Sequence, residues 1–358
     1  MKSPRRGAAQ SYIGPRRGSA VGASHTLHFP ASRPPLSVSP PVSHIPPPFV
    51  AAATARWTLE SSACAVAVGN FDGVHLGHAA IVRQLCAAAR RFDVPAVAFT
   101  FDPHPAAVLR PDSAPAPLTT PARRAALLRS LGVDAVLVQP TDPALVSLPA
   151  EVFYAEILRS RLHARAIVEG TDFRFGAGRA GDIHLLKTLC SRDDVTLETV
   201  PAVMADGQPV SSSRLRGLIA AGAVREAALL LTSPYRLTGT VVEGARRGGT
   251  IGFPTANLSG IATLLPAAGV YAARVTLPDL VTIPAAVHIG PNISFGETRI
   301  SVEAHLIGFS GTLYGSTLDV DFLARLRDTQ RFDSIDALKT QLTADVARAL
   351  EVVGFSAG

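Results

Sequence analysis

GNFDGVHLGH, residues 69–78, is the stretch that decides the fold of this chain. A short apolar run, Cys64 to Val68, precedes it, and residues 79–92 follow it with apolar side chains at helical spacing. This order predicts a strand, a tight loop and a helix. The glycines let the loop backbone approach a ligand closely, and the first turn of the helix offers unpaired N–H groups to an anion. We expect a phosphate to bind there.

Two histidines close this stretch. His75 and His78 are three residues apart, so both imidazoles lie over the first turn of a helix that begins there and can donate to the same anion. Fixed donors of this kind suit nucleotidyl transfer, because the α-phosphate gains charge in the transition state. The alternative is a loop with two surface histidines, and HLGH alone does not decide between the two.

Length and composition indicate a globular protein of two domains. The chain has 358 residues, of which 47% are hydrophobic, which is enough for two separate cores. No apolar run approaches the roughly 20 residues that a membrane span needs. Cys64, Cys86 and Cys190 lack metal-ligand spacing and cannot all pair, which indicates reduced thiols and a cytoplasmic protein.

The positive charge is concentrated at the N-terminus. The formal net charge is +6, and residues 1–56 contain seven basic side chains and no acidic one, so subtracting these seven leaves −1 for the remainder. A nearly neutral body has no basic face for nucleic acid, and small molecules are the expected partners.

Residues 1–56 are predicted to be a disordered extension. They are rich in Pro, Ser, Ala and Arg, show no periodicity, and include the run IPPP at 45–48. Three interpretations stay open for this segment: upstream sequence translated from a misplaced start codon or a dispensable tail, an organellar transit peptide, and an interaction arm.

Residues 57–235 alternate short apolar runs with amphipathic stretches. This pattern predicts parallel strands with right-handed crossovers, hence a doubly wound α/β sheet. One helix is well marked, because Thr120 caps it, Pro121 occupies its first position and Gly132 ends it. Ligands of such sheets bind beyond the carboxyl ends of the strands, where the loop at 69–78 is expected. The strands are expected at residues 63–68, 96–100, 135–138, 166–168 and 195–200.

Two further loops are expected at the same edge of the sheet. Residues 100–105, TFDPHP, form a turn stiffened by two prolines. Residues 169–176, EGTDFRFG, combine aromatic rings with charges, so a flat aromatic ligand can stack there. The residues expected to contact it are His104, Asp172 and Phe175. The alternative is a pair of ordinary loops with the phenylalanines packed inward.

VSSSRLR, residues 210–216, leads into another predicted helix. Serines at a helix start cap the helix or bind phosphate oxygens, and an arginine just inside adds charge and a fork of donors. The serines and an arginine just inside this helix are therefore candidate phosphate ligands, with plain capping as the alternative.

Residues 236–358 consist of closely spaced β-like runs, separated by Gly, Pro and Asn turns and followed by one helix. This predicts a small closed barrel of six strands and a C-terminal helix that begins near Ser334. The helix carries one apolar stripe that we expect to pack on the barrel, formed by Ile335, Leu338, Leu342, Val346 and Leu350.

A glycine-rich stretch at 244–257, GARRGGTIGFPTAN, is the candidate site of this second domain. Its glycines permit a backbone cradle for phosphates. Thr255 and Asn257 are two apart, so in an extended segment a hydroxyl and an amide oxygen point to one side, where they can ligate Mg²⁺. The residues expected to contact ATP are Gly244, Arg247 and Gly252. The alternative is a glycine-rich turn that enters a strand.

Three of these motifs resemble those of known families. GNFDGVHLGH resembles the signature of the HxGH nucleotidyltransferase superfamily, most closely that of its FAD synthetase branch. VSSSRLR is similar to the Ser-Ser-Thr-x-Ile-Arg motif of that branch, with Ser213 in place of Thr and Leu215 in place of Ile. GFPTAN, residues 252–257, resembles the riboflavin kinase signature. Over residues 58–355 the chain therefore resembles the bacterial bifunctional riboflavin kinase and FAD synthetase family.

This resemblance implies two ATP-dependent activities. The C-terminal domain would phosphorylate riboflavin to FMN, with Mg²⁺ on Thr255 and Asn257 and with Glu303 of the stretch VEAH as catalytic base. The N-terminal domain would adenylylate FMN to FAD and release pyrophosphate, with His75 and His78 as catalytic residues. The residues expected to bind ATP or phosphate there are Gly69, Phe71, Asp72, Gly77, Ser212, Ser213 and Arg216.

The chain departs from the family pattern at Arg246, where a glycine is typical, and at Gly249, where a basic residue is typical. An altered glycine-rich turn would weaken ATP binding at the kinase site. Two other functions stay open: an FAD synthetase or other HxGH nucleotidyltransferase whose β-domain only binds flavin, and a non-catalytic flavin- or nucleic-acid-binding protein. The chain is expected to be a monomer or a weak homo-oligomer.

Overall fold

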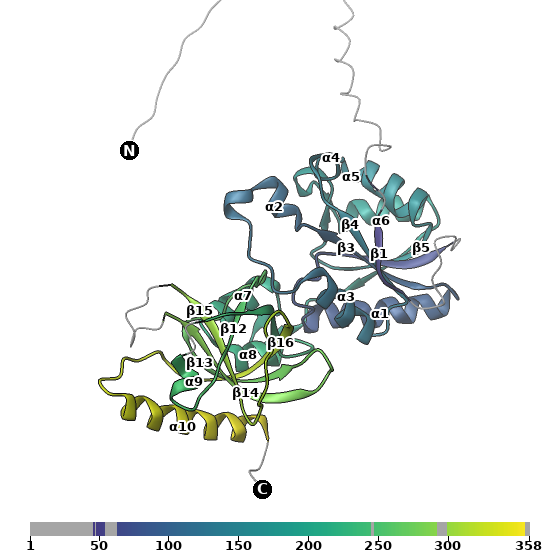
Figure 1. Cartoon of the computed structure of the whole chain (residues 1–358). Coiled ribbons are helices and arrows are strands. Elements are labelled where there is room, and N and C mark those ends of the chain that lie inside the picture. The colour runs from purple at the N-terminus through teal and green to yellow at the C-terminus, as the bar shows by residue number, and fades with distance from the viewer. Residues whose placement is uncertain (1–45, 47, 54–62, 245–246, 292–298, 355–358) are drawn as a thin grey trace, which may run out of the picture. The chain divides into compact units, whose positions relative to one another are not determined.

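A computed structural model describes residues 46, 48–53, 63–244, 247–291 and 299–354 of the chain. An α/β region built on one open sheet is followed by a closed antiparallel barrel with a C-terminal helix (Figure 1). Both predicted fold classes are therefore confirmed.

The open sheet has the strand order β1-β4-β3-β2-β5-β8. All neighbouring pairs from β4 to β8 are parallel, as the alternating pattern predicted. The parallel strands are β2 Cys64–Val68, β3 Ala96–Asp102, β4 Ala135–Pro140, β5 Ala164–Gly170 and β8 Thr196–Val200. The chain leaves β2 for β3 on one side and later adds β5 on the other. The strand order thus reverses at β2, and ligands of open α/β sheets bind beyond such a point.

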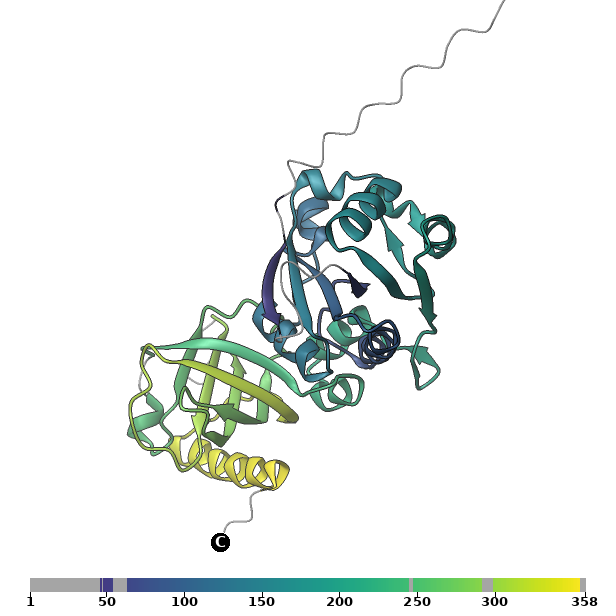
Figure 2. The ribbon, with the colours of Figure 1, turned by 90° about the vertical axis from the view of Figure 1, so that its right-hand side faces the viewer.

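Helices cover both faces of this sheet (Figures 1 and 2). α1 (Leu76–Arg91) and α3 (Pro121–Ser130) pack on one face, where their apolar side chains share a buried cluster with β2 to β4. The π-helical segment η3 (Phe153–Arg161) and α6 (Ile183–Arg192) pack on the other face. The helix pairs separate because the crossovers before and after the reversal run on opposite sides of the sheet.

The helix α3 has the predicted ends. Thr120 caps it by accepting the N–H of Arg123, Pro121 is its first residue, and Gly132 follows it with a φ of +102° that favours glycine. The short elements of this region are α2 Pro105–Leu109, η2 Pro111–Ser113, α4 Pro143–Val146, α5 Ala150–Val152, β6 Arg174–Phe175, η4 Ala177–Arg179, β7 Gly181–Asp182, β9 Met204–Ala205 and β10 Gln208–Pro209.

Strand β1 (Phe49–Ala53) corrects the expectation that residues 1–56 are disordered throughout. It pairs antiparallel with β4 at the edge of the sheet, and the carbonyl oxygen of Pro46 accepts hydrogen bonds from Gln139 and Arg161. The preceding prolines do not prevent this, because they lie before the strand and not within it. Residues 1–45, 47 and 54–56 lie outside the described residues.

The barrel closes in the order β11-β12-β15-β14-β13-β16. Its strands are β11 Tyr235–Val242, β12 Ala256–Ser259, β13 Gly269–Thr276, β14 Thr282–Gly290, β15 Ser301–Leu306 and β16 Thr317–Arg327, and the four-residue α9 (Arg247–Thr250) lies between β11 and β12. Alternate residues of these strands fill the barrel core, so Val302, Ala304 and Leu306 point inward whereas Glu303 and His305 point outward.

Two helices that precede the barrel share its core. Leu215 and Ile219 of α7 (Ser212–Ala220) and Leu230 of α8 (Val224–Leu230) belong to the same buried cluster as the inner barrel residues. The predicted domain boundary between residues 235 and 236 stays a prediction, and the apolar packing across it is continuous.

The C-terminal helix α10 (Ile335–Val353) begins where predicted, since Ser334 caps it by accepting the N–H of Ala337. It packs on the outside of β13, β14 and β16. The centre of its packed face is polar: Asp345, 4% exposed, binds Arg327 of β16. Ile335, predicted to begin the apolar stripe, lies in the first turn of the helix and is 60% exposed.

Candidate active sites

His75 and His78 form the first turn of α1. His75 caps the helix through Nδ1, which accepts the N–H of Gly77 at 3.1 Å and that of His78 at 3.3 Å. His78 Nδ1 accepts the N–H of His75 at 3.3 Å, and the rings stack with centroids 3.6 Å apart. Because each Nδ1 accepts a hydrogen bond, the proton of each neutral ring is on Nε2. The capping hydrogen bonds thus leave the Nε2–H group of each histidine as its hydrogen-bond donor.

These donors are uncharged at neutral pH. Burial lowers the pKa of His75 to about 4, against a weaker opposing effect of the Asp72 carboxylate. Burial also lowers the pKa of His78 well below its usual range, and the neighbouring His75 and Arg124 act in the same direction. A neutral pair can hold an anion only through dipoles and hydrogen bonds, so any positive charge for an anion at this loop would have to come from arginine.

Gly77 is required by the ring of His75. A Cβ at residue 77 would lie 3.0 Å from Cε1 and 3.1 Å from Nδ1 of that ring. A side chain there would therefore displace the imidazole from its capping position. The sequence predicted Gly77 as a phosphate contact, and the structure adds a packing reason for the same residue.

The backbone of the loop is held in a strained shape. Phe71, Gly73 and Val74 have φ values of +45°, +84° and +43°. This left-handed conformation is unfavourable for a β-branched residue such as Val74 and costs on the order of 1–3 kcal/mol. Thr232 holds it in place, because its hydroxyl donates to the Val74 carbonyl oxygen at 2.7 Å.

Asp72 organises this loop and its surroundings. Its buried carboxylate accepts the N–H groups of Leu118 and Thr119 and the Thr119 hydroxyl at 2.9 to 3.0 Å, and it binds Arg216 at 2.5 Å. A carboxylate with this many donors has little capacity left for a ligand, and it repels a phosphate. The predicted phosphate contact at Asp72 stays a prediction, and its position favours support of Arg216.

The serine-rich motif at residues 210–216 packs against the loop at residues 69–78, called the first loop below. The Ser212 hydroxyl donates to the Asp72 carbonyl oxygen at 2.8 Å, and Arg216 Nε donates to the Ala116 carbonyl oxygen at 2.8 Å. Ser211, one residue earlier than the predicted ligands, caps α7 by accepting the N–H of Arg214. Ser213 is exposed. Two motifs far apart in sequence thus meet at one place, as the resemblance implied.

Arg124 is a residue that the sequence analysis missed. It is 5% exposed and donates to the Thr100 hydroxyl at 3.1 Å and to the Phe101 carbonyl oxygen at 3.0 Å, with another nitrogen 3.9 Å from Asp72. Its buried Nε has no hydrogen-bond partner in the described structure. The signal in the sequence is an arginine at helical spacing from Leu127 and Leu128 on an apolar face.

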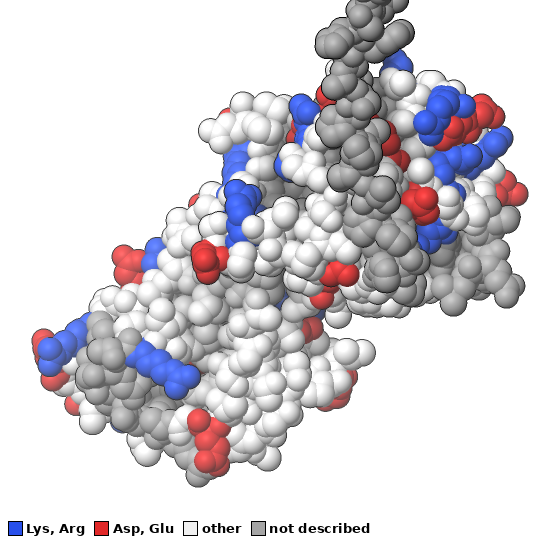
Figure 3. Space-filling model, turned by 90° about the horizontal axis from the view of Figure 1, so that it is seen from above, with Lys and Arg blue, Asp and Glu red and all other residues white. Residues whose placement is uncertain are grey.

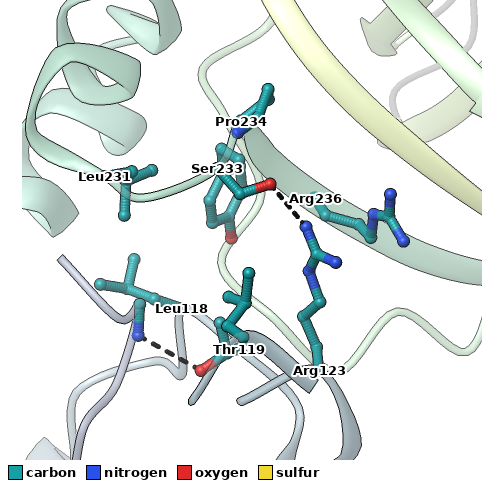
Figure 4. Close-up of a pocket in the computed structure, with 10 residues that line it drawn as sticks. Leu118, Thr119, Arg123, Leu231, Ser233, Pro234 and Arg236 are labelled. Carbon is teal, nitrogen blue, oxygen red and sulfur yellow. Dashed lines mark hydrogen bonds between the residues drawn. The ribbon is translucent and has the colours of Figure 1, made fainter. Parts of the chain in front are cut away.

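Gly73 of the loop also lines a small hollow (Figure 4). The N–H of Gly73 donates to the Thr119 hydroxyl at 3.2 Å, and Arg123 of α3 donates to the Ser233 hydroxyl at 2.8 Å, as the dashed lines show. These bonds link the loop and α3 with the segment that enters β11. The segment that leads into β11 therefore contacts α3 through Ser233, and it contacts the loop itself through the bond of Thr232 to Val74.

The predicted flavin contacts divide into two groups. His104 caps α2 by accepting the N–H of Ala106 at 3.0 Å, and burial and the charge of Arg216, the predicted phosphate ligand, lower its pKa. Asp172 is exposed. Phe175 is 6% exposed and packs in the core against Phe153 and Phe173. Stacking of Phe175 on a ligand is therefore not supported, and the inward-packed alternative describes this ring.

Glu169 is a second missed residue, at the point where the strand order reverses. β2 and β5 pair up to Val66 and Ile167 and then separate, and the Glu169 carboxyl accepts the N–H of Val68 at 2.7 Å in place of a strand partner. It is 2% exposed, and burial raises its pKa well above the usual range, so the protonated form is favoured. A protonated acid thus holds the strand end beside the first loop.

We expect Glu169→Gln to keep the bond to Val68 and to remove the pH dependence that this group causes. Its pKa is raised in the folded state, so wild-type stability falls as pH rises above the unfolded value of about 4.3. Urea unfolding should give equal stabilities at pH 5 and a more stable variant at pH 9. Glu169→Leu, which leaves the Val68 N–H unpaired, should be about 1–3 kcal/mol less stable than Glu169→Gln at both pH values. A variant less stable than wild type at pH 9 would contradict this role.

The second site lies on the outer face of the barrel. Glu303 Oε1 accepts the Ser301 hydroxyl at 3.1 Å, and Oε2 accepts the Thr255 hydroxyl at 3.3 Å. Asn257 of β12 lies directly opposite Glu303 in the strand register, so the two side chains share a face. The structure thus brings together the three predicted residues Thr255, Asn257 and Glu303.

The glycine-rich segment lies against these residues. A Cβ on Gly244 would lie 2.2 Å from the Asn257 amide nitrogen, and one on Gly248 would lie 2.3 Å from the Phe253 carbonyl oxygen. Gly252 has a φ of +91°, which favours glycine. Arg246 lies outside the described residues, and Arg247 begins α9. Close approach of the backbone is therefore the reason for glycine at 244 and 248.

The oxygen donors of this site fit a hard cation. A hydroxyl, an amide oxygen and a carboxylate on one face are ligands that Mg²⁺ accepts alongside substrate phosphates. Among the described residues no group of three or more His, Cys, Asp or Glu side chains is placed to bind a metal by itself. A metal here would therefore depend on the phosphates of a substrate.

Two family models match the two regions of the chain. A model described as FAD synthetase matches residues 58–214, and one described as riboflavin kinase matches residues 231–353. A Pseudomonas fluorescens protein named bifunctional riboflavin kinase/FMN adenylyltransferase is 38% identical over 300 residues, which cover 83% of this chain and 96% of that protein. An Escherichia coli K12 protein of the same name is 34% identical over 293 residues, which cover 82% of this chain and 94% of that protein.

A solved structure has the same fold over most of the chain. It is titled macrolide-efflux protein from Streptococcus pneumoniae and matches with a TM-score of 0.72 and 33% identity, over 82% of this chain and 96% of that one. Within the described residues, no helix is both long and apolar enough to cross a membrane.

Proposed function

The chain belongs to the family of bifunctional riboflavin kinase/FMN adenylyltransferases, and we propose how its own residues carry out the two reactions. It phosphorylates riboflavin to FMN with ATP and adenylylates FMN to FAD, because both catalytic domains of that family are present. The observation that carries the assignment of residues is the convergence of two separate sets of phosphate-site residues, one around His75 and one around Glu303.

The kinase step belongs to the outer face of the barrel. Glu303 takes the proton of the riboflavin 5′-hydroxyl while that oxygen attacks the γ-phosphorus of ATP, and the bond to the β-phosphate oxygen breaks to leave ADP. The Thr255 and Ser301 hydroxyls hold the two carboxylate oxygens and so fix the direction of the base. Backbone at Gly244 and Gly248 approaches the same face and can contact the phosphates.

Mg²⁺ is the metal that we propose for this site, held by Thr255 and Asn257. Its charge would offset the negative charge that develops on the transferring phosphoryl group. The support is the set of hard oxygen donors that the strand register places around Glu303.

The adenylyl transfer belongs to the first loop. The FMN phosphate attacks the α-phosphorus of ATP, and pyrophosphate leaves with the electron pair of the broken bond. His75 and His78 donate from Nε2 to the oxygens that gain charge, and Arg216, held by Asp72, supplies the positive charge. The proposal keeps the remaining predicted contacts, which are Gly69 and Phe71 in the loop itself and Ser212, Ser213, His104 and Asp172 outside it.

We further propose a monomer or weak homo-oligomer in the cytoplasm, with small-molecule partners and no nucleic acid. On the face shown in Figure 3, Lys and Arg side chains are interspersed with Asp and Glu and separated by uncharged residues. The three buried thiols are unpaired, in agreement with a reducing compartment. Residues 57–235 and 236–358 are the proposed domains.

The test uses the purified full chain with riboflavin, ATP and Mg²⁺, and separates the flavins by chromatography. We expect FMN to form first and FAD to follow, and added FMN to give FAD without riboflavin. FAD from added FMN without any phosphorylation of riboflavin would support a nucleotidyltransferase with a flavin-binding barrel. FMN without FAD would contradict the adenylylation step, and neither product would contradict both.

A further inference from the structure

A row of side chains crosses the outside of the barrel beside the kinase base. In the strand register, Glu303 of β15 lies directly opposite Asn257 of β12 on one side and His288 of β14 on the other. Residues directly opposite in neighbouring strands project to the same face, with Cβ atoms about 5 Å apart. His288 is therefore as close a neighbour of Glu303 as the proposed metal ligand Asn257 is.

The burial pattern fixes the direction of this row. Val287 and Ile289, on either side of His288, are 0% and 1% exposed and belong to the barrel core. His288 must then point outward, to the side of Glu303. No motif in the sequence singles out this histidine, because its relation to Glu303 exists only through the pairing of β14 with β15.

The row continues to the C-terminal helix. His288 lies opposite Val270 of β13, and Val270 lies opposite Arg327 of β16. Arg327 binds Asp345 of α10 through Nε at 2.9 Å and through a terminal nitrogen at 2.7 Å. His288 thus lies between the Glu303 carboxylate and a guanidinium whose charge is already balanced by Asp345.

The ring of His288 leans toward the end of β14 at which Ser301 holds the base. Its Nε2 lies 3.7 Å from where a Cβ on Gly290 would be, and Gly290 is opposite Ser301 in the register. The Ser301 hydroxyl lies within hydrogen-bond distance of both the Gly290 carbonyl oxygen, at 3.2 Å, and Glu303 Oε1, at 3.1 Å. Burial lowers the pKa of His288, with Arg327 in the same direction and Glu303 opposing, so the imidazole is neutral at pH 7 and adds no charge that would compete with the phosphates.

We propose that His288 is a positioning residue of the kinase: it confines the Glu303 carboxylate on the side opposite Thr255 and Asn257. This rests on the proposed role of Glu303 as the base. The proton still moves from the 5′-hydroxyl to Glu303, the new bond forms to the γ-phosphorus, and ADP leaves. His288 limits the rotation of the Glu303 carboxylate, so that the carboxylate faces the 5′-hydroxyl of riboflavin. Because this affects the orientation of the base, we expect the effect on kcat.

The experiment compares His288→Ala and His288→Gln in the full chain. We expect His288→Ala to lower kcat for FMN formation about tenfold, with the KM values for riboflavin and ATP within about twofold of wild type. His288→Gln, which keeps a neutral side chain of similar length beside Glu303, should recover most of this loss. Adenylylation of added FMN by the same preparations should be unchanged and shows that the chain is folded.

Thr282→Ala is the matched control. Thr282 lies on the same strand and the same face as His288, at the far end of β14, opposite Thr276. This variant should retain the wild-type kcat. The proposal is overturned if His288→Ala retains kcat within twofold, if it raises KM with kcat unchanged, or if His288→Gln is as impaired as His288→Ala. A wild-type chain that forms no FMN would instead overturn the kinase function itself.

Discussion

Glu303→Gln is expected to lower the rate of FMN formation by about 10²–10⁴-fold, the usual contribution of a positioned general base. Glutamine has nearly the same shape, and the hydroxyls of Thr255 and Ser301 can still bond to it, so the site should keep its structure. It cannot accept the proton of the 5′-hydroxyl. The measurement is kcat for riboflavin phosphorylation, with the KM values for ATP and riboflavin determined separately.

Two controls make this result specific to the base. Adenylylation of added FMN by Glu303→Gln should equal that of wild type, because the first-loop residues are not touched. Glu351→Gln changes an exposed glutamate of α10 and should leave both reactions unchanged. A Glu303→Gln protein that phosphorylates riboflavin at a rate within about tenfold of wild type would show that another group accepts the proton.

The architecture was predictable from the sequence because it depends on local patterns. The apolar runs that end at Val68, Thr100 and Val138 became parallel strands, and the caps at Thr120 and Ser334 mark helix starts. These signals need only a few neighbouring residues. The barrel was predictable for the same reason, since closely spaced runs with turn residues between them favour antiparallel pairing.

The support of the first loop was not predictable, because it depends on contacts between distant residues. The residues next to Asp72 in the sequence predict that it binds a ligand. Its partners in the structure, Thr119 and Arg216, are 47 and 144 residues away. Glu169 reads as part of an aromatic loop, and its bond to Val68 arises only because two strands separate there. Phe175 points into the core because β6 and β7 fold the loop back on η3, which no local pattern indicates.

At the edge of the sheet, composition predicted too little structure. Residues 49–53 lie in a segment whose composition predicts disorder, yet they form β1 on β4. Phe49 and Val50 are 50% and 38% exposed, so little apolar burial holds this strand, and backbone pairing dominates. Composition indicates whether a segment can form a hydrophobic core of its own. It does not indicate whether the segment can pair as an extra strand with the edge of a sheet that already exists.

His75→Asn is expected to lower the rate of FAD formation from FMN by about 10²–10³-fold while the helix keeps its cap. The Asn side-chain oxygen takes the place of Nδ1 and can accept the N–H groups of Gly77 and His78, and Asn is among the best capping residues. The Nε2–H donor is lost. If His75 acts through that donor, loss of one preorganised hydrogen bond to the transition state has this magnitude.

His75→Ala separates the two roles of the imidazole, because it removes the cap as well as the donor. Its free energy of unfolding should fall by about 0.5–2 kcal/mol, whereas His75→Asn should lose less than about 1 kcal/mol, and both should be equally poor in adenylylation. His184→Asn, a change at an exposed histidine in the first turn of α6, is the matched control and should behave as wild type. Riboflavin phosphorylation should be unchanged in all three. A His75→Asn protein that makes FAD at the wild-type rate would reduce His75 to a helix cap and leave the transfer to His78 and Arg216.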